Sequence, residues 1–121
     1  MDIPGMIDVD SMIRTINESN NFDKGFASVL YKQISKEVQS FENTLDEDHE
    51  VGVRLVSFGQ SIQFHVSTIE YKNPYIFIFK GFLDNGSPVK LIQHISQLSF
   101  LLVKVKRLKP EEPKRPIGFV S

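Results

Sequence analysis

The fold is decided by residues 51–83, VGVRLVSFGQSIQFHVSTIEYKNPYIFIFKGFL. Three runs in this stretch are rich in β-branched and aromatic residues, and two short turn sequences, GQS at 59–61 and NP at 73–74, separate them. This pattern predicts three strands joined as an antiparallel meander. The predicted strands are Val51–Phe58, Ile62–Tyr71 and Tyr75–Leu83.

Side-chain alternation assigns faces to these strands. In the second strand, Ile62, Phe64 and Val66 alternate with polar residues, which predicts one apolar face and one solvated face. The third strand is apolar on both faces, with Phe77 and Ile78 on opposite sides. We therefore expect it to be central in the sheet or covered on both sides.

The acidic section before the strands is predicted to be helical. From Asp23 onward, apolar residues advance eighteen positions in five steps, a mean of 3.6, which predicts an amphipathic helix. These residues are Ala27, Leu30, Ile34, Val38, Phe41 and Leu45. The acidic run Asp46–Glu50 is unfavourable at a helix C-terminus and is predicted to be a loop. A thin apolar stripe predicts a shorter helix over residues 8–20.

Two structures compete for the stretch after residue 83. Asp84–Gly86 is typical of a hairpin turn, but Ser87-Pro88 has the pattern of a helix N-cap followed by proline at the first helical position. A helix over 87–107 is the preferred interpretation, and a strand over Phe100–Lys106 is the alternative. The preference rests on apolar residues at intervals of 4, 3, 4 and 3, namely Leu91, Ile95, Leu98, Leu102 and Val105.

Prolines 110, 113 and 116 oppose both helix and central strand, so residues 109–116 are predicted to be an extended arm and Ile117–Val120 a short edge strand. The expected fold class is α+β: a three- to four-stranded antiparallel sheet packed with two main helices, an N-terminal helical section and an extended proline-rich C-terminal arm. The chain is expected to be one domain, 1–121. Its sections are an acidic helical part (1–50), a strand meander (51–83), a helix (87–107) and the arm (108–121).

The composition excludes several classes of site and of function. The 121 residues suffice for one domain, and the absence of cysteine excludes disulfides, thiolate nucleophiles and Cys-ligated metal sites. No signal-peptide pattern and no long apolar run is present, so we expect a cytoplasmic protein with no membrane partner. Residues 1–50 carry eleven acids against four bases, whereas residues 51–121 carry four against ten. With a pI of about 6.3, DNA binding is not expected.

Catalytic and metal-binding patterns are missing. The histidines, His49, His65 and His94, lie in no recognisable catalytic motif, so no enzyme activity is expected. His49 is interpreted as a solvated residue and His65 as a structural one. His94 is interpreted as a structural or interface residue, with ligand contact as the alternative. The acidic run 46–50 lacks the spacing of a calcium loop, and neither a metal nor a cofactor is predicted.

Anion and base recognition is better supported. Lys90, in the first turn of the predicted helix, would meet a phosphate, and Arg54, Lys106 and Arg107 would add charge-assisted hydrogen bonds. The alternative for the C-terminal cations is simple compensation of the helix dipole. Phe79 and Phe82, on either side of a lysine and a glycine, would offer a ring on which a nucleobase stacks, and the alternative for each is a core or interface position.

The segment Phe79-Lys80-Gly81 and the following GSPVKLIQHISQLSFLL at 86–102 resemble a family of small phage proteins that counter the Thoeris defence system. These are the first-described type of Thoeris anti-defence protein. The similar stretch runs from about Val51 to Phe119, and LIQHxSQL at 91–98 is its most distinctive part.

The resemblance implies a sponge that binds the cyclic ADP-ribose-type signal made by a TIR-domain protein, keeps it intact and so blocks an NAD-depleting effector. Cyclic oligonucleotides are a further implied ligand class, a homodimer or higher homo-oligomer the implied assembly, and the host bacterial cytoplasm the implied location. The implied ligand-binding residues are Arg54, Lys90, one of Phe79 and Phe82, and one of Lys106 and Arg107. The alternative function is a protein–protein interaction module that inhibits a host factor, and a small hydrolase of such nucleotides is a third hypothesis.

Overall fold

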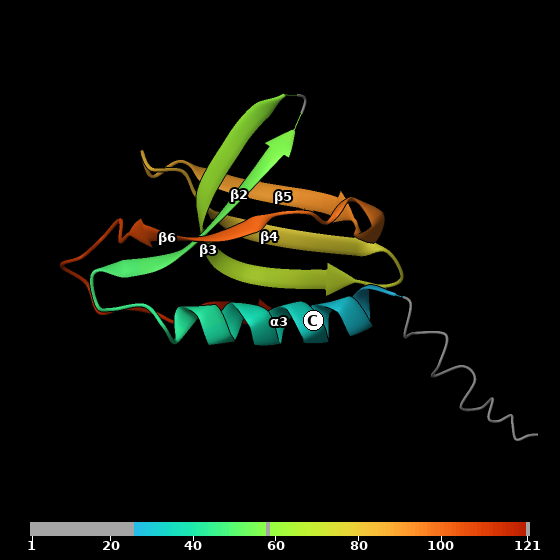
Figure 1. Ribbon diagram of the computed structural model, residues 1–121, viewed down its shortest axis with the longest axis horizontal. Coiled ribbons are helices and arrows are strands. Elements are labelled where there is room, and N and C mark those ends of the chain that lie inside the picture. The colour runs from blue at the N-terminus through green and yellow to red at the C-terminus, as the bar shows by residue number, and fades with distance from the viewer. Residues whose placement is uncertain (1–25, 58, 121) are drawn as a thin grey trace, which may run out of the picture.

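The computed structural model describes residues 26–57 and 59–120, which form an α+β fold of one sheet with a helix on one face (Figure 1). Strand order is β5-β4-β3-β2-β6, and β7 pairs with β3 beside this path. The predicted helix over 8–20 lies outside the described residues. The elements are α3 (Ala27–Glu42), β2 (His49–Ser57), β3 (Gln60–Lys72), β4 (Ile76–Phe82), β5 (Pro88–His94), the 3-10 turn η2 (Ile95–Gln97), β6 (Leu101–Lys106) and β7 (Gly118–Val120).

Helix α3 confirms the helix predicted from the 3.6-residue spacing. It begins beside the β3–β4 turn, where the Ala27 amide donates to the Pro74 carbonyl at 2.8 Å. Ala27 and Val38 are buried, and the other residues of the apolar stripe pack partly buried against the same core. The helix ends at Glu42, after which a loop leads to β2. No helix of the described residues is long and apolar enough to cross a membrane.

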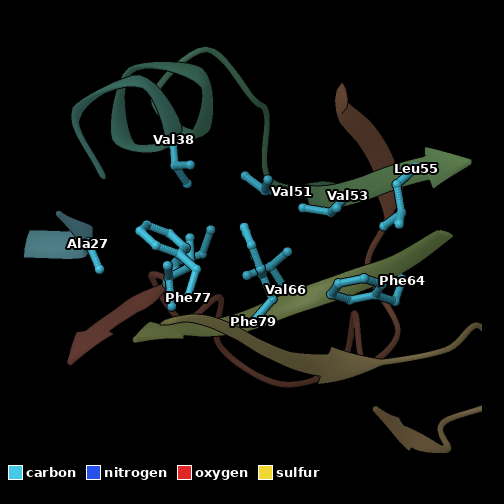
Figure 2. Close-up of a cluster of buried hydrophobic side chains, with 11 residues drawn as sticks. Ala27, Val38, Val51, Val53, Leu55, Phe64, Val66, Phe77 and Phe79 are labelled. Carbon is cyan, nitrogen blue, oxygen red and sulfur yellow. The ribbon is translucent and has the colours of Figure 1, made fainter. Parts of the chain in front are cut away.

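The predicted meander is confirmed, because β2, β3 and β4 pair antiparallel in sequence order. Their inner faces, which point toward α3, carry the buried side chains (Figure 2). Phe77 and Phe79 of β4 are fully buried there, with Val51 and Val53 of β2 beside them. The prediction that β4 is central in the sheet is confirmed, since β3 pairs with one of its edges and β5 with the other.

The predicted helix over 87–107 is wrong. This stretch forms β5, η2 and β6, so the structure has a six-stranded sheet and one main helix among the described residues. Strand β5 pairs with β4, with Leu91 opposite Phe79, and β6 pairs with β2. The hairpin interpretation of Asp84–Gly86 holds: the Gly86 amide donates to the Leu83 carbonyl, and Gly86 has a φ of 88°. Leu91 therefore faces inward through strand alternation, not helical spacing.

The predicted extended arm is replaced by a bent segment, residues 107–117, which we call the C-terminal connection. It contains a turn in which the Glu112 amide donates to the Lys109 carbonyl, and it packs against the loop between α3 and β2. Lys114 donates to the Asp46 carbonyl at 2.7 Å, and the Ile117 amide donates to a Glu42 carboxylate oxygen at 3.1 Å. The short terminal strand is confirmed as β7, which pairs in parallel with β3.

Candidate functional site

The candidate site lies where one edge of β3 changes partner. Strand β2 pairs with β3 as far as His65, and β7 begins to pair on the same side at Thr68. Between them, Val66 and Ser67 have no strand partner on this side within residues 26–57 and 59–120, and the pairing with β4 is irregular at the same place. A cavity of about 690 Å³, which we call the main hollow, opens here on the outer face of the sheet.

The floor of the main hollow is a buried histidine between two carboxylates. His65 is 4% exposed. Its Nδ1 lies 2.6 Å from Oε2 of Glu50, and its Nε2 lies 2.8 Å from Oδ1 of Asp84. Both partners are carboxylate oxygens, and only a doubly protonated ring can donate to both of them. Because both nitrogens are engaged, neither is available to take a proton from a bound molecule.

One rim of the main hollow is the C-terminal connection, which supplies its cations. The guanidinium of Arg107 donates to the Glu47 carbonyl at 3.0 Å and also to the carbonyls of Lys109 and Glu112, so it holds this segment in shape. The side chains of Lys109 and Arg115 also line the hollow, are exposed and have no hydrogen-bond or ion-pair partner among the described residues. They are therefore the cations that a bound anion would meet.

The opposite rim is the β4–β5 turn with Phe82. The ring of Phe82 is 41% exposed. It borders both the main hollow and a second cavity of about 370 Å³, the minor hollow, whose lining includes Lys80 and Lys90. Lys80 pairs with Glu70 at 2.8 Å, and this ammonium holds the pKa of the Glu70 carboxyl below its usual value. Within the described part of the chain, Lys90 is thus the unpaired cation of the minor hollow.

Of the six residues predicted to bind ligand, the structure brings Phe82, Lys90 and Arg107 to these two hollows. Phe79 is fully buried, and its ring packs edge-on against Phe100 at 5.1 Å, so it belongs to the core and cannot serve as a stacking platform in this conformation. Arg54 and Lys106 are exposed and line neither hollow. The Arg54 guanidinium instead donates to Gln63 at 2.8 Å.

Sequence reasoning missed the centre of the site. It placed His65 on the polar face of its strand, which is correct, but the two carboxylates that contact it lie 15 and 19 residues away along the chain. It also gave no ligand-contacting role to Lys109. The pairing of β2, β3 and β4 brings Glu50 and Asp84 to His65, and the bend of the C-terminal connection brings the tail cations, so neither contact follows from a local sequence pattern.

The most distinctive sequence run, LIQHISQL, has a local structural explanation. His94 Nδ1 accepts from the Ser96 amide at 3.0 Å, and the Gln97 side chain accepts from the His94 amide at 2.8 Å. The His94 ring also stacks on Tyr75, with ring centroids 5.1 Å apart. These residues cap η2 and fix the route from β5 to β6, and they line neither hollow. No group of three His, Cys, Asp or Glu residues suited to a metal ion occurs in the described part of the chain.

Comparison with known proteins assigns the chain to a family whose description names no function. Residues 22–120 match the family described as "Family of unknown function (DUF6173)", and the chain belongs to it. No curated protein matches the chain. No solved structure matches it either.

Proposed function

We propose that this member of the DUF6173 family binds a cyclic ADP-ribose-type signalling nucleotide and sequesters it intact, which would block Thoeris defence in the host bacterial cytoplasm. One observation carries the binding part of this proposal. The exposed ring of Phe82 stands between two hollows, with Lys109 and Arg115 on one side and Lys90 on the other. The choice of this nucleotide and of Thoeris rests on the resemblance of residues 51–119 to the anti-defence family.

The chemistry of the two hollows suits a nucleotide. A cavity of about 690 Å³ falls in the size range of small-molecule sites, which is roughly 300–1,000 Å³. An exposed aromatic ring binds a base by stacking, and arginine binds phosphate oxygens through two parallel hydrogen bonds. Phe82 and Arg115 offer these two contacts on opposite rims of the main hollow.

Sequestration rather than turnover of the ligand is supported by the contacts of the His65 ring. A general base must have a free nitrogen within reach of the proton that it removes. Both nitrogens of this ring are held by carboxylates, and the ring is almost completely buried. We therefore keep the proposal of a protein that holds its ligand unchanged and that acts by being present in excess over the signal.

The test is titration calorimetry of the full chain with glyco-cyclic ADP-ribose, then with ADP-ribose and a cyclic oligonucleotide. The complex is afterwards heated, and the released nucleotide is identified by mass spectrometry. Binding with release of intact nucleotide is expected. An altered nucleotide would indicate a hydrolase, and no binding of any of the three would overturn the proposal in favour of a protein-binding module.

Two variants and two matched controls locate the site. Phe82→Ala and Arg115→Ala should each weaken binding by about fivefold to 150-fold, because each removes a contact worth roughly 1–3 kcal/mol. The controls are Ile92→Ala, an exposed apolar residue of β5 outside both hollows, and Lys32→Ala, an exposed cation of α3. Equal affinity for Phe82→Ala and Ile92→Ala would remove the stacking platform from the site.

The proposal includes a homodimer, which is the commonest symmetric assembly. Light scattering with and without nucleotide tests the assembly. A monomer that binds nucleotide would separate the ligand proposal from the dimer proposal.

A further inference from the structure

Among the described residues that line the main hollow, only the side chain of His65 is linked to both rims of the hollow, in each case through a carboxylate. On one side, Glu50 Oε2 accepts from His65 and also, at 3.3 Å, from the Leu108 amide of the C-terminal connection. On the other side, Asp84 begins the β4–β5 turn and accepts from the other ring nitrogen. Contacts to one imidazole ring therefore link the two rims of the hollow to each other.

The same ring decides the charge of the hollow. Its lining carries three carboxylates, Glu50, Asp84 and Glu112, and three permanent cations, Arg107, Lys109 and Arg115. These six charges cancel. A doubly protonated His65 therefore leaves the hollow with one net positive charge, and a neutral His65 leaves it with none.

We propose that His65 is a positioning residue whose protonated form holds both rims and makes the hollow receptive to an anion. Anion binding is thereby coupled to the protonation of His65. This inference rests on the proposed function, which supplies a phosphorylated ligand for the hollow.

The direction of the coupling follows from the hydrogen bonds. Neutral imidazole donates from one nitrogen only, so one of the two carboxylates would face a lone pair. Asp84 is the partner that leaves, because its side chain is 82% exposed and water can replace the ring, whereas Glu50 is 31% exposed and also holds the Leu108 amide. Raising the pH therefore releases the β4–β5 turn and weakens anion binding.

The charged groups around His65 come from three elements, and a pH titration of the hollow must take all of them into account. They are Glu50 from β2, Asp84 from the turn after β4, and the charged residues of the C-terminal connection. Of the residue types that line this hollow, histidine is the one whose charge ordinarily changes near neutrality, so the proposal assigns the pH dependence to His65.

The first experiment needs no ligand. Nitrogen-15 spectra of the His65 ring in the full chain, at slightly acidic pH, should show both ring nitrogens protonated. The protection factors of the amides of residues 85–87, which are corrected for the intrinsic pH dependence of exchange, should fall as the pH rises. The variants His65→Gln and Asp84→Asn should show fast exchange of this turn already at the lower pH. A single protonated ring nitrogen at slightly acidic pH, or exchange of the turn that does not depend on His65, would overturn the inference.

The second experiment measures nucleotide affinity across neutral pH. Wild-type affinity should fall as the pH rises, while His65→Gln and Asp84→Asn should bind roughly tenfold more weakly at the lower pH and with a flatter profile. The matched control is His49→Gln, since His49 also contacts a carboxylate, Asp46, at 2.6 Å, but lies outside the hollow. Its profile should match that of the wild type.

The two experiments keep two failures apart. If the wild type binds no nucleotide but the ligand-free ring and turn behave as expected, the proposed function fails and the positioning role of His65 stands. If the wild type binds nucleotide with the same affinity at every pH, the coupling is refuted while the proposed function survives.

Discussion

Replacing Gly81 by alanine should disrupt the floor of the candidate site from within the sheet. Gly81 is buried on β4 opposite Val66 of β3. A Cβ at this position would lie 1.8 Å from the carbonyl oxygen of His65 and 2.8 Å from its carbonyl carbon. Both atoms belong to the backbone of β3, so no side-chain rotation can relieve the contact.

The size of the effect follows from the overlap. Real Cβ atoms essentially never approach another heavy atom closer than 3.0 Å, so β3 and β4 must separate locally by at least 1.2 Å, the difference between 3.0 and 1.8 Å. Such a displacement breaks the neighbouring ladder hydrogen bonds, each worth about 1 kcal/mol net, and adds the cost of overpacking, about 1–3 kcal/mol. We expect a loss of about 3 kcal/mol and a fall in melting temperature of roughly 12–24 °C.

The assay is urea denaturation followed by circular dichroism, with Gly59→Ala as the matched control. Gly59 has a φ of 76°, and a Cβ added there would meet no described heavy atom within 4 Å, so alanine should cost only its backbone strain, about 1 kcal/mol. Gly81→Ala should also abolish nucleotide binding because His65 moves with the strand. A Gly81→Ala protein as stable as the Gly59→Ala protein would refute the steric argument.

Three further predictions concern the connections around the site. Arg107→Ala should cost about 1–2 kcal/mol in thermal unfolding as well as binding affinity, because its guanidinium donates to three backbone carbonyls; an unchanged melting temperature would contradict this role. Glu42→Ala should speed amide exchange over residues 117–120, since the Glu42 carboxylate accepts from the Ile117 amide, and exchange equal to that of Glu37→Ala would contradict the anchor. The Lys80 ammonium lowers the pKa of Glu70, so this pair stabilises the fold above the usual glutamate pKa and stops doing so as the pH falls through the lowered value. Lys80→Met should return the Glu70 pKa toward normal in an NMR titration, and an unchanged pKa would contradict the pairing.

The sequence predicted those elements whose pattern is local and unambiguous. Helix α3 follows from six apolar residues at helical spacing, and the meander follows from alternation between two turn sequences. The stretch 88–106 was misassigned because its leucines satisfy helical spacing while Leu91 and Val105 also satisfy strand alternation. What separates the two interpretations is β4, whose second edge and two apolar faces need a further strand beside it.

The candidate site was only partly predictable for a related reason. Phe82 was found from the lysine and glycine beside it in the chain. Lys90 was chosen for the first turn of a helix that does not form, and it lines the minor hollow from β5 instead. Arg115 and Lys109 reach the site only because the C-terminal connection bends back, and that bend depends on hydrogen bonds from Arg107 to carbonyls up to 60 residues away. No local pattern encodes such a contact.

The division between floor and rims indicates where ligand specificity resides. The floor is fixed, since the backbone of His65 lies against Gly81 inside the sheet and its ring is held by two carboxylates. The rims are a hairpin turn and an irregular connection, and the connection carries Lys109 and Arg115, whose side chains have no partner among the described residues. Sites supported on strands keep their geometry, whereas loops tolerate substitution. Under the proposed function, exchanges of rim residues should therefore change which anion binds, whereas His65→Gln, a change to the floor, should weaken the binding of every anion by a similar factor.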